Sequence, residues 1–121
     1  MATPAKDTVS ADRWISDGGG APLPIYPHTG VRVNATATAA STTAAAVPSG
    51  ATVIEVRATD AIWIRFGLAS VGAAAADNNS ILWTPGSGPI WLPEVDNQTS
   101  THFRCMRVGA ADVPVQLEAI A

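Results

Sequence analysis

The sequence predicts an all-β protein: an antiparallel β-sandwich or jelly-roll-like domain at residues 31–121, preceded by an extended N-terminal arm at residues 1–30. From residue 31 onward, apolar and polar residues alternate with a period of two, which places one face of each strand in a core and the other in water. The alternating segments are short and are separated by glycine, proline and asparagine, as in sandwiches and small barrels.

Composition indicates one folded domain and excludes several classes of partner. The 121 residues are 47% hydrophobic and only 14% charged, whereas disordered chains combine low hydrophobicity with high charge. The net charge is -3 and the seven Lys and Arg residues are scattered, so no nucleic-acid partner is expected. No apolar run approaches the roughly 20 residues that span a bilayer, and the N-terminal sequence has no apolar signal-peptide core. We therefore expect synthesis in the cytoplasm and no membrane partner.

The first 30 residues differ from the rest of the chain. They contain the triple glycine 18–20 and four prolines, which oppose helix continuation and sheet hydrogen bonding. Trp14 and Ile15 are the large apolar pair of its first part. The segment is interpreted either as a flexible terminus or as an arm that docks on a neighbouring chain through Trp14.

The expected strands of the domain follow one another closely. Their ranges are residues 31–36, 52–58, 61–66, 81–83, 90–92, 101–108 and 113–120. Thr59-Asp60 is a two-residue link of the kind that closes a hairpin. Residues 84–89 read as a turn, and residues 109–112 as the connection between the last two strands.

Pro114 within the last expected strand predicts an edge position or a β-bulge, because proline cannot donate a ladder hydrogen bond. Residues 31–38 carry no comparable protection, so we expect this segment to pair within the domain or with a neighbouring subunit. Two alanine-rich stretches, residues 37–47 and 71–76, lack a stripe of large apolar side chains. Strand or loop is predicted for both, with one short helix as the alternative.

Few residues are candidates for a metal site. His102 and Cys105 are three apart, and on a strand this spacing sends them to opposite faces. Cys105 is therefore expected in the core and His102 on the surface. Cys105 is also the chain's single cysteine, which excludes an internal disulfide. Residues 77–79 offer oxygen atoms to a cation, but no second carboxylate cluster accompanies them.

Candidate catalytic residues are equally few. Residues 86–88 read Gly-Ser-Gly without the lysine of a phosphate-binding loop, and a turn is the simpler interpretation. No Gly-x-Ser-x-Gly elbow accompanies His28 or His102. Glu94 and Asp96 are interpreted as surface carboxylates. We predict no enzymatic activity, no metal and no cofactor.

Tryptophan is in excess, with four copies against three Phe and Tyr together. Trp63, Trp83 and Trp91 have two interpretations. One is burial within the domain or at its rim; the other is an interface, where Trp and Arg are enriched. The candidate partner-binding residues are Trp14, Ile15, Trp63, Arg65 and Trp91.

Three short segments carry a resemblance to a known group. Residues 62–67 read IWIRFG, residues 82–86 read LWTPG and residues 101–104 read THFR. They resemble a strand end, a Pro-Gly turn and a strand start of small β-rich virion proteins of tailed bacteriophages, many of which decorate or cement the head. The resemblance covers about residues 50–108. Trp83, Trp91 and the charged loop 94–96 depart from it, which leaves head surface, neck and tail open as positions.

The resemblance implies a non-enzymatic structural protein of the virion, in the first place a capsid decoration or cement protein. Its partners would be the major capsid protein or other virion proteins. Modest contacts multiplied by avidity on a symmetric shell would supply the binding energy. We expect a homo-oligomer, with a trimer as the first expectation, located in the virion after synthesis in a bacterial cytoplasm.

Two alternatives remain from the residues themselves. The first is a carbohydrate-binding β-sandwich in which Trp63, Trp83 or Trp91 forms the sugar-stacking platform. The second is a small hydrolase, which would depend on Glu94, Asp96 and the two histidines.

Overall fold

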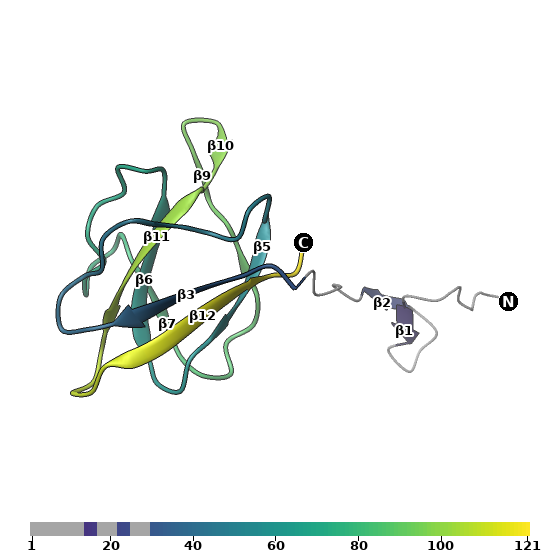
Figure 1. Cartoon of the computed structure of the whole chain (residues 1–121). Helices are drawn as coiled ribbons and strands as arrows, with labels where there is room; N and C mark the ends of the chain where they lie inside the picture. The colour runs from purple at the N-terminus through teal and green to yellow at the C-terminus, as the bar shows by residue number, and fades with distance from the viewer. Residues whose placement is uncertain (1–13, 17–21, 25–29) are drawn as a thin grey trace, which may run out of the picture.

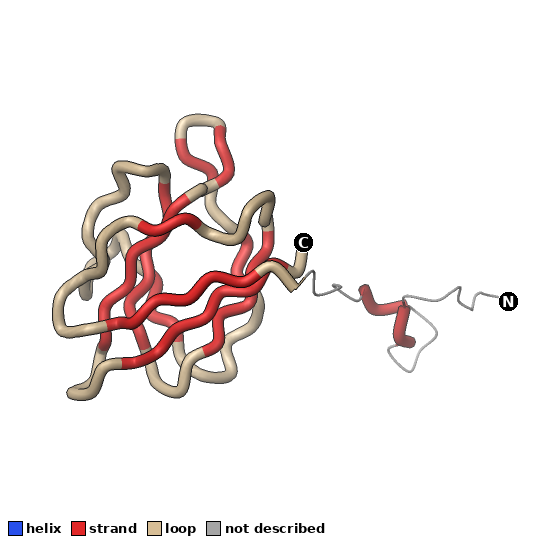
Figure 2. Tube along the Cα trace, viewed as in Figure 1, coloured by secondary structure: helices blue, strands red, loops and turns tan. Residues whose placement is uncertain are grey.

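The computed structural model describes residues 14–16, 22–24 and 30–121, and these contain strands and loops but no helix (Figures 1 and 2). The strands are β1 (Trp14–Ser16), β2 (Pro22–Pro24), β3 (Arg32–Ala37), β4 (Ala45–Ala46), β5 (Val53–Arg57), β6 (Ile62–Gly67), β7 (Ile81–Trp83), β8 (Ile90–Trp91), β9 (Glu94–Val95), β10 (Gln98–Thr99), β11 (His102–Arg107) and β12 (Val113–Ala119). The predicted all-β class is confirmed.

Two four-stranded antiparallel sheets make up the body of the domain. Sheet I has the strand order β4-β11-β6-β7, and sheet II has the order β3-β12-β5-β8. Buried side chains of both sheets form one hydrophobic cluster, which includes Ile62, Ile64 and Phe103 from sheet I and Ile54 and Leu117 from sheet II. The two sheets therefore share a single core in a sandwich-like arrangement, as the period-two alternation requires.

The expected hairpin between β5 and β6 is wrong. β5 pairs with β12 and β8, whereas β6 pairs with β11 and β7. Thr59 and Asp60 thus carry the chain from sheet II to sheet I, and the Asp60 carboxylate accepts a hydrogen bond from the next backbone N–H at 2.8 Å. The crossing lets the apolar faces of both strands enter the same core, which a hairpin within one sheet would also have allowed. The alternation of apolar and polar residues therefore does not distinguish a hairpin within one sheet from a crossing between two sheets.

Neither the edge strand nor the β-bulge expected for Pro114 is found, since β12 lies between β3 and β5 and its register with β3 continues without interruption through Pro114. The N–H of Ala119 donates to Val31 on the β3 side, and the N–H of Ile120 donates to Val53 on the β5 side. By alternation the nitrogen of Pro114 faces the β5 side, where the ladder has already ended at the pair of Gln116 and Arg57. The missing N–H therefore breaks no hydrogen bond of the sheet.

Strand β3 pairs with β12 over its full length and leaves its other side as an edge of sheet II. The expected pairing of residues 31–38 within the domain is confirmed for β3. Pairing with a neighbouring subunit stays a prediction.

The loops follow the turn chemistry of the sequence. Ser87 donates its N–H to Thr84 at 3.0 Å, and Gly86 has a φ of 93°. Pro85 and Gly86 therefore occupy the central positions of a type II turn, where proline and glycine are favoured. The predicted turn is confirmed.

Both alanine-rich stretches are loop or short strand, as predicted. The segment from Thr38 to Val47 follows β11: Arg107 donates to Thr38, Thr42 donates to Cys105, and Val47 donates to Thr101. These backbone bonds bind the segment to the edge of sheet I.

The six described residues of the N-terminal part form a two-stranded antiparallel ribbon, with Trp14 opposite Pro24 and Ile15 opposite Leu23. The sequence did not predict this ribbon. The other residues of the expected arm at 1–30 lie outside the described part of the chain, except Gly30.

Candidate functional site

The face of sheet I that points away from the core carries a row of apolar side chains. Trp63 of β6 lies between Leu82 of β7 and Met106 of β11 in the strand register. Their neighbours along the strands, Ile62, Trp83 and Cys105 among them, belong to the core cluster. Leu82 is 50% exposed, and Trp63 and Met106 are half-buried. We call Trp63, Leu82 and Met106, together with Val108 two residues further on, the outward face.

Val108 is 47% exposed and extends this apolar row beyond the end of β11. Exposed apolar side chains on adjacent strands are characteristic of protein contact surfaces when they gather on one side. The arrangement can bury Leu82 and Val108 against a partner without any change in the sandwich.

Two arginines border the outward face. Arg65 and Arg104 are directly opposite each other in the β6–β11 register. The Arg104 guanidinium donates to the carbonyl of Thr42 at 2.6 Å and to that of Val71 at 3.2 Å, and Arg65 donates to Ala73 at 3.4 Å. Both guanidinium groups therefore hold the alanine-rich loops on sheet I.

The five predicted partner-binding residues are distributed over three places. Trp63 and Arg65 lie together on the outward side of β6. Trp91 belongs to β8 of sheet II, where it pairs with Val53 and is 66% exposed. Trp14 and Ile15 lie in β1, and their side chains are outside the described part of the structure.

Sequence analysis missed Leu82 and Met106 as members of the outward face. Leu82 stands in the continuous apolar run 81–83, where no alternation marks an outward position. Met106 becomes a neighbour of Trp63 only through the pairing of β11 with β6.

Trp83 differs from the other two tryptophans of the sandwich. It is 3% exposed and belongs to the core cluster, so burial holds for Trp83 but not for Trp91. Its indole N–H makes no hydrogen bond within the described residues. Trp83 therefore has no exposed ring face to offer as a sugar-stacking platform.

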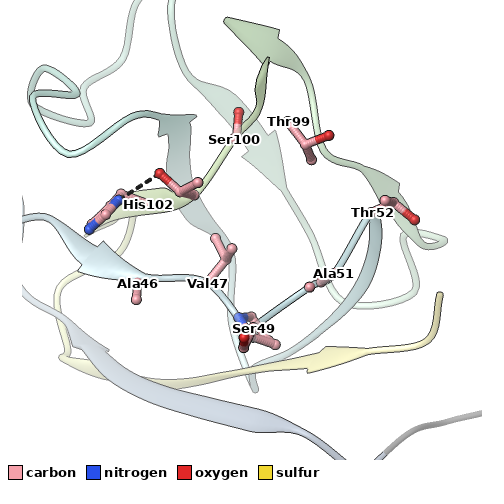
Figure 3. Close-up of a pocket in the computed structure, with 11 residues that line it drawn as sticks. Ala46, Val47, Ser49, Ala51, Thr52, Thr99, Ser100 and His102 are labelled. Atoms are coloured by element: carbon pink, nitrogen blue, oxygen red, sulfur yellow. Dashed lines mark hydrogen bonds between the residues drawn. The ribbon is translucent and has the colours of Figure 1, made fainter. Parts of the chain in front are cut away.

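A cavity of about 470 Å³ lies between residues 46–52, which connect β4 to β5, and residues 99–102, which lead from β10 into β11 (Figure 3). The first wall contains a turn in which Ala51 donates to Pro48 at 3.1 Å, with Gly50 at a φ of 74°. The second wall is fixed by Ser100, whose hydroxyl donates to the carbonyl of Pro93 at 2.6 Å. Both walls are therefore held by hydrogen bonds within the protein.

The candidate metal ligands of the sequence lie apart from one another. As predicted, Cys105 is fully buried while His102 is partly exposed on the other face of β11. The Asp77 carboxylate accepts a hydrogen bond from the N–H of Asn79 at 2.9 Å, which closes a local turn. Among the described residues, no group of three or more His, Cys, Asp or Glu side chains is arranged to hold a metal ion.

Glu94 and Asp96 lie in a small hairpin formed by β9 and β10. Asp96 and Asn97 have φ values of 50° and 62°, as the central residues of a type I′ turn do. Glu94 and Asp96 are both exposed, as expected of surface carboxylates.

A buried carboxylate lies on the outward side of sheet II. Glu118 stands between the core residues Leu117 and Ala119 but is only 1% exposed. Its Oε1 atom lies 2.7 Å from Nη2 of Arg57, and its Oε2 atom lies 3.5 Å from Nη2 of Arg32. The same Nη2 of Arg57 is 3.0 Å from Glu55. The strands on both sides of β12 therefore supply the positive charge that this carboxylate requires.

Comparison with known proteins gives no relative: no protein-family model, no curated protein and no solved structure matches the chain. Within the described residues, no helix is long and apolar enough to cross a membrane.

Burial raises the pKa of the Cys105 thiol above its usual 9.0, and a hydrogen bond with Thr42 opposes part of this shift. The unfolded thiol loses its proton near pH 9.0 while the folded thiol keeps it. The folded state then binds more protons, so the free energy of unfolding should fall as the pH rises above 9.0, by at most about 1.4 kcal/mol per pH unit. Urea unfolding between neutral and alkaline pH measures this slope. Cys105→Ala should show a shallower alkaline slope, and an identical slope would contradict the prediction.

Proposed function

We propose that this chain is a non-enzymatic structural protein of a tailed-phage virion, a decoration protein that binds the capsid surface through the outward face. The observation that carries the proposal is the apolar row on the outward side of sheet I, in which Leu82 is exposed and Trp63 and Met106 are half-buried. Such a row on a rigid sheet provides contact area without reordering of the chain.

The resemblance to virion proteins supports the same surface. Its three segments fall in β6, in β7 with the following turn, and at the start of β11. These strands are neighbours in sheet I. Two residues of the outward face, Trp63 and Leu82, lie within these segments, and Met106 follows the third segment in β11.

In this proposal the partners are the major capsid protein or other virion proteins, and the chain acts as a homo-oligomer with a trimer as the first expectation. Sheet edges at β3, β4, β7 and β8 offer backbone groups for contacts between subunits. A role in the neck or tail of the virion would need the same kind of contact surface. The place at which the protein binds on the particle distinguishes these roles from decoration of the head.

Leu82→Lys should weaken binding to purified phage heads about tenfold, because a charge would be buried in the apolar contact. The measurement is co-sedimentation of the protein with heads of the virus that carries this gene. Gln98→Lys, at an exposed position of the β9–β10 hairpin, is the matched control and should bind as the parent chain does. Equal binding of Leu82→Lys and the parent, or binding of neither to heads, would contradict the proposal.

A carbohydrate-binding function is the second candidate, because the Trp91 side chain is 66% exposed. Trp83 is excluded as its platform by burial. Sugar binding can be monitored by tryptophan fluorescence. Its loss in Trp91→Ala would favour this candidate.

A further inference from the structure

Residues that carry hydroxyl groups line the cavity of Figure 3 on both of its walls. Ser49 and Thr52 belong to the first wall, and Thr99 and Thr101 to the second. Hydroxyl groups both donate and accept hydrogen bonds. The cavity therefore presents a set of groups that suits a ligand with hydroxyl groups of its own.

The imidazole of His102 adds a further polar group at the same site. Its Nδ1 atom lies 2.8 Å from the Thr101 hydroxyl, so this nitrogen is already engaged (Figure 3). Whichever of the two groups donates, Nε2 is left to donate to or accept from a ligand. A neighbouring hydroxyl thus fixes the ring and leaves one nitrogen for recognition.

The rest of the lining is small and apolar. Val47, Pro48 and Ala51 are buried residues that contribute to the cavity surface. Among the described residues, none that lines the cavity is an Asp, Glu, Lys or Arg. A charged ligand would lose its hydration here without meeting an opposite charge, which is costly.

We propose that this cavity binds an uncharged saccharide unit. The hydroxyl groups of the walls and His102 would exchange hydrogen bonds with the sugar hydroxyls, and the apolar lining would contact the C–H groups of the ring. The volume of about 470 Å³ lies within the range of small-molecule sites. The proposal does not rest on the virion role, and its site differs from the Trp91 platform of the second candidate.

The test is an NMR titration of the ¹⁵N-labelled full chain with glucose, N-acetylglucosamine and maltose at millimolar concentrations. Binding should shift the amide signals of residues 49–52 and 99–102. Thr52→Val and Thr99→Val preserve the shape of the side chain and remove one hydroxyl, and each should weaken binding about fivefold. Thr43→Val changes an exposed threonine outside the cavity and should leave binding unchanged.

The NMR spectrum of each variant without sugar shows whether the variant is folded. Ser49→Ala, at an exposed turn position, replaces any threonine variant that does not fold. Absence of shifts with all three sugars would overturn the proposal. Shifts centred on Trp91, or unchanged binding by Thr52→Val and Thr99→Val, would also overturn it. Particle binding is measured separately, so failure of the saccharide site and failure of the decoration role are distinguishable.

Discussion

Arg57→Met should lower the free energy of unfolding by about 3 kcal/mol, because it leaves the buried Glu118 carboxylate without its nearest positive charge. Nη2 of Arg57 lies 2.7 Å from Oε1 of Glu118, whereas Nη2 of Arg32 lies 3.5 Å from Oε2, and both arginine side chains are about half exposed. Methionine retains the apolar stem of the arginine, so the loss reports the charge rather than the packing. Urea unfolding at neutral pH measures the effect.

The matched variant is Glu118→Gln, which removes the buried charge and leaves two arginines that reach solvent. We expect it to cost less than Arg57→Met, because an exposed arginine is hydrated whereas a buried carboxylate is not. In the double variant, Glu118→Gln should restore part of the stability lost through Arg57→Met. If the two changes were additive, the ion pair would not be the cause of the loss.

The importance of Glu118 could not be inferred from the sequence. The alternation of β12 correctly places Gln116 and Glu118 on the side opposite Val115 and Leu117. It does not show that Glu118 lies in the centre of a sheet, opposite Arg32 of β3 and Glu55 of β5. Arg32 and Glu55 precede Glu118 by 86 and 63 residues in the sequence, and only the sheet topology brings the three together.

The same distinction explains which parts of the fold were predictable. The side chains of Ile62 and Ile64 face the core and those of Trp63 and Arg65 face away, because alternation is a local property. Membership of a sheet is not local. The link Thr59-Asp60 has the length of a hairpin, yet it connects two sheets.

The candidate site follows this rule as well. Trp63 and Arg65 are two residues apart on one strand, so their common side could be predicted. Leu82 and Met106 complete the outward face from the two neighbouring strands, and they follow Trp63 by 19 and 43 residues in the sequence. The walls of the saccharide cavity likewise come from residues 46–52 and 99–102, which no sequence motif links.

Arg104 provides the second large expected effect, since one side chain joins two loops to sheet I. Its guanidinium donates to the carbonyls of Thr42 and Val71, which lie 29 residues apart by subtraction. Arg104→Met should lower the free energy of unfolding by about 2 kcal/mol, because both charge-assisted hydrogen bonds are lost and the carbonyls lose their donors. Urea unfolding measures the total loss.

Hydrogen exchange locates this effect within the fold. The N–H of Ala74 donates to the hydroxyl of Ser41 at 2.9 Å, so it reports whether the two loops remain in contact. In Arg104→Met this amide should exchange faster, while amides of β12 should respond only to the change in global stability. Arg65→Met is the control: its one bond to Ala73 is 3.4 Å long and exposed, so a loss of less than about 0.5 kcal/mol is expected. Equal losses in the two variants would contradict the role assigned to Arg104. They would indicate that the loss comes from removing a charge on this face of sheet I and not from removing the two hydrogen bonds to Thr42 and Val71.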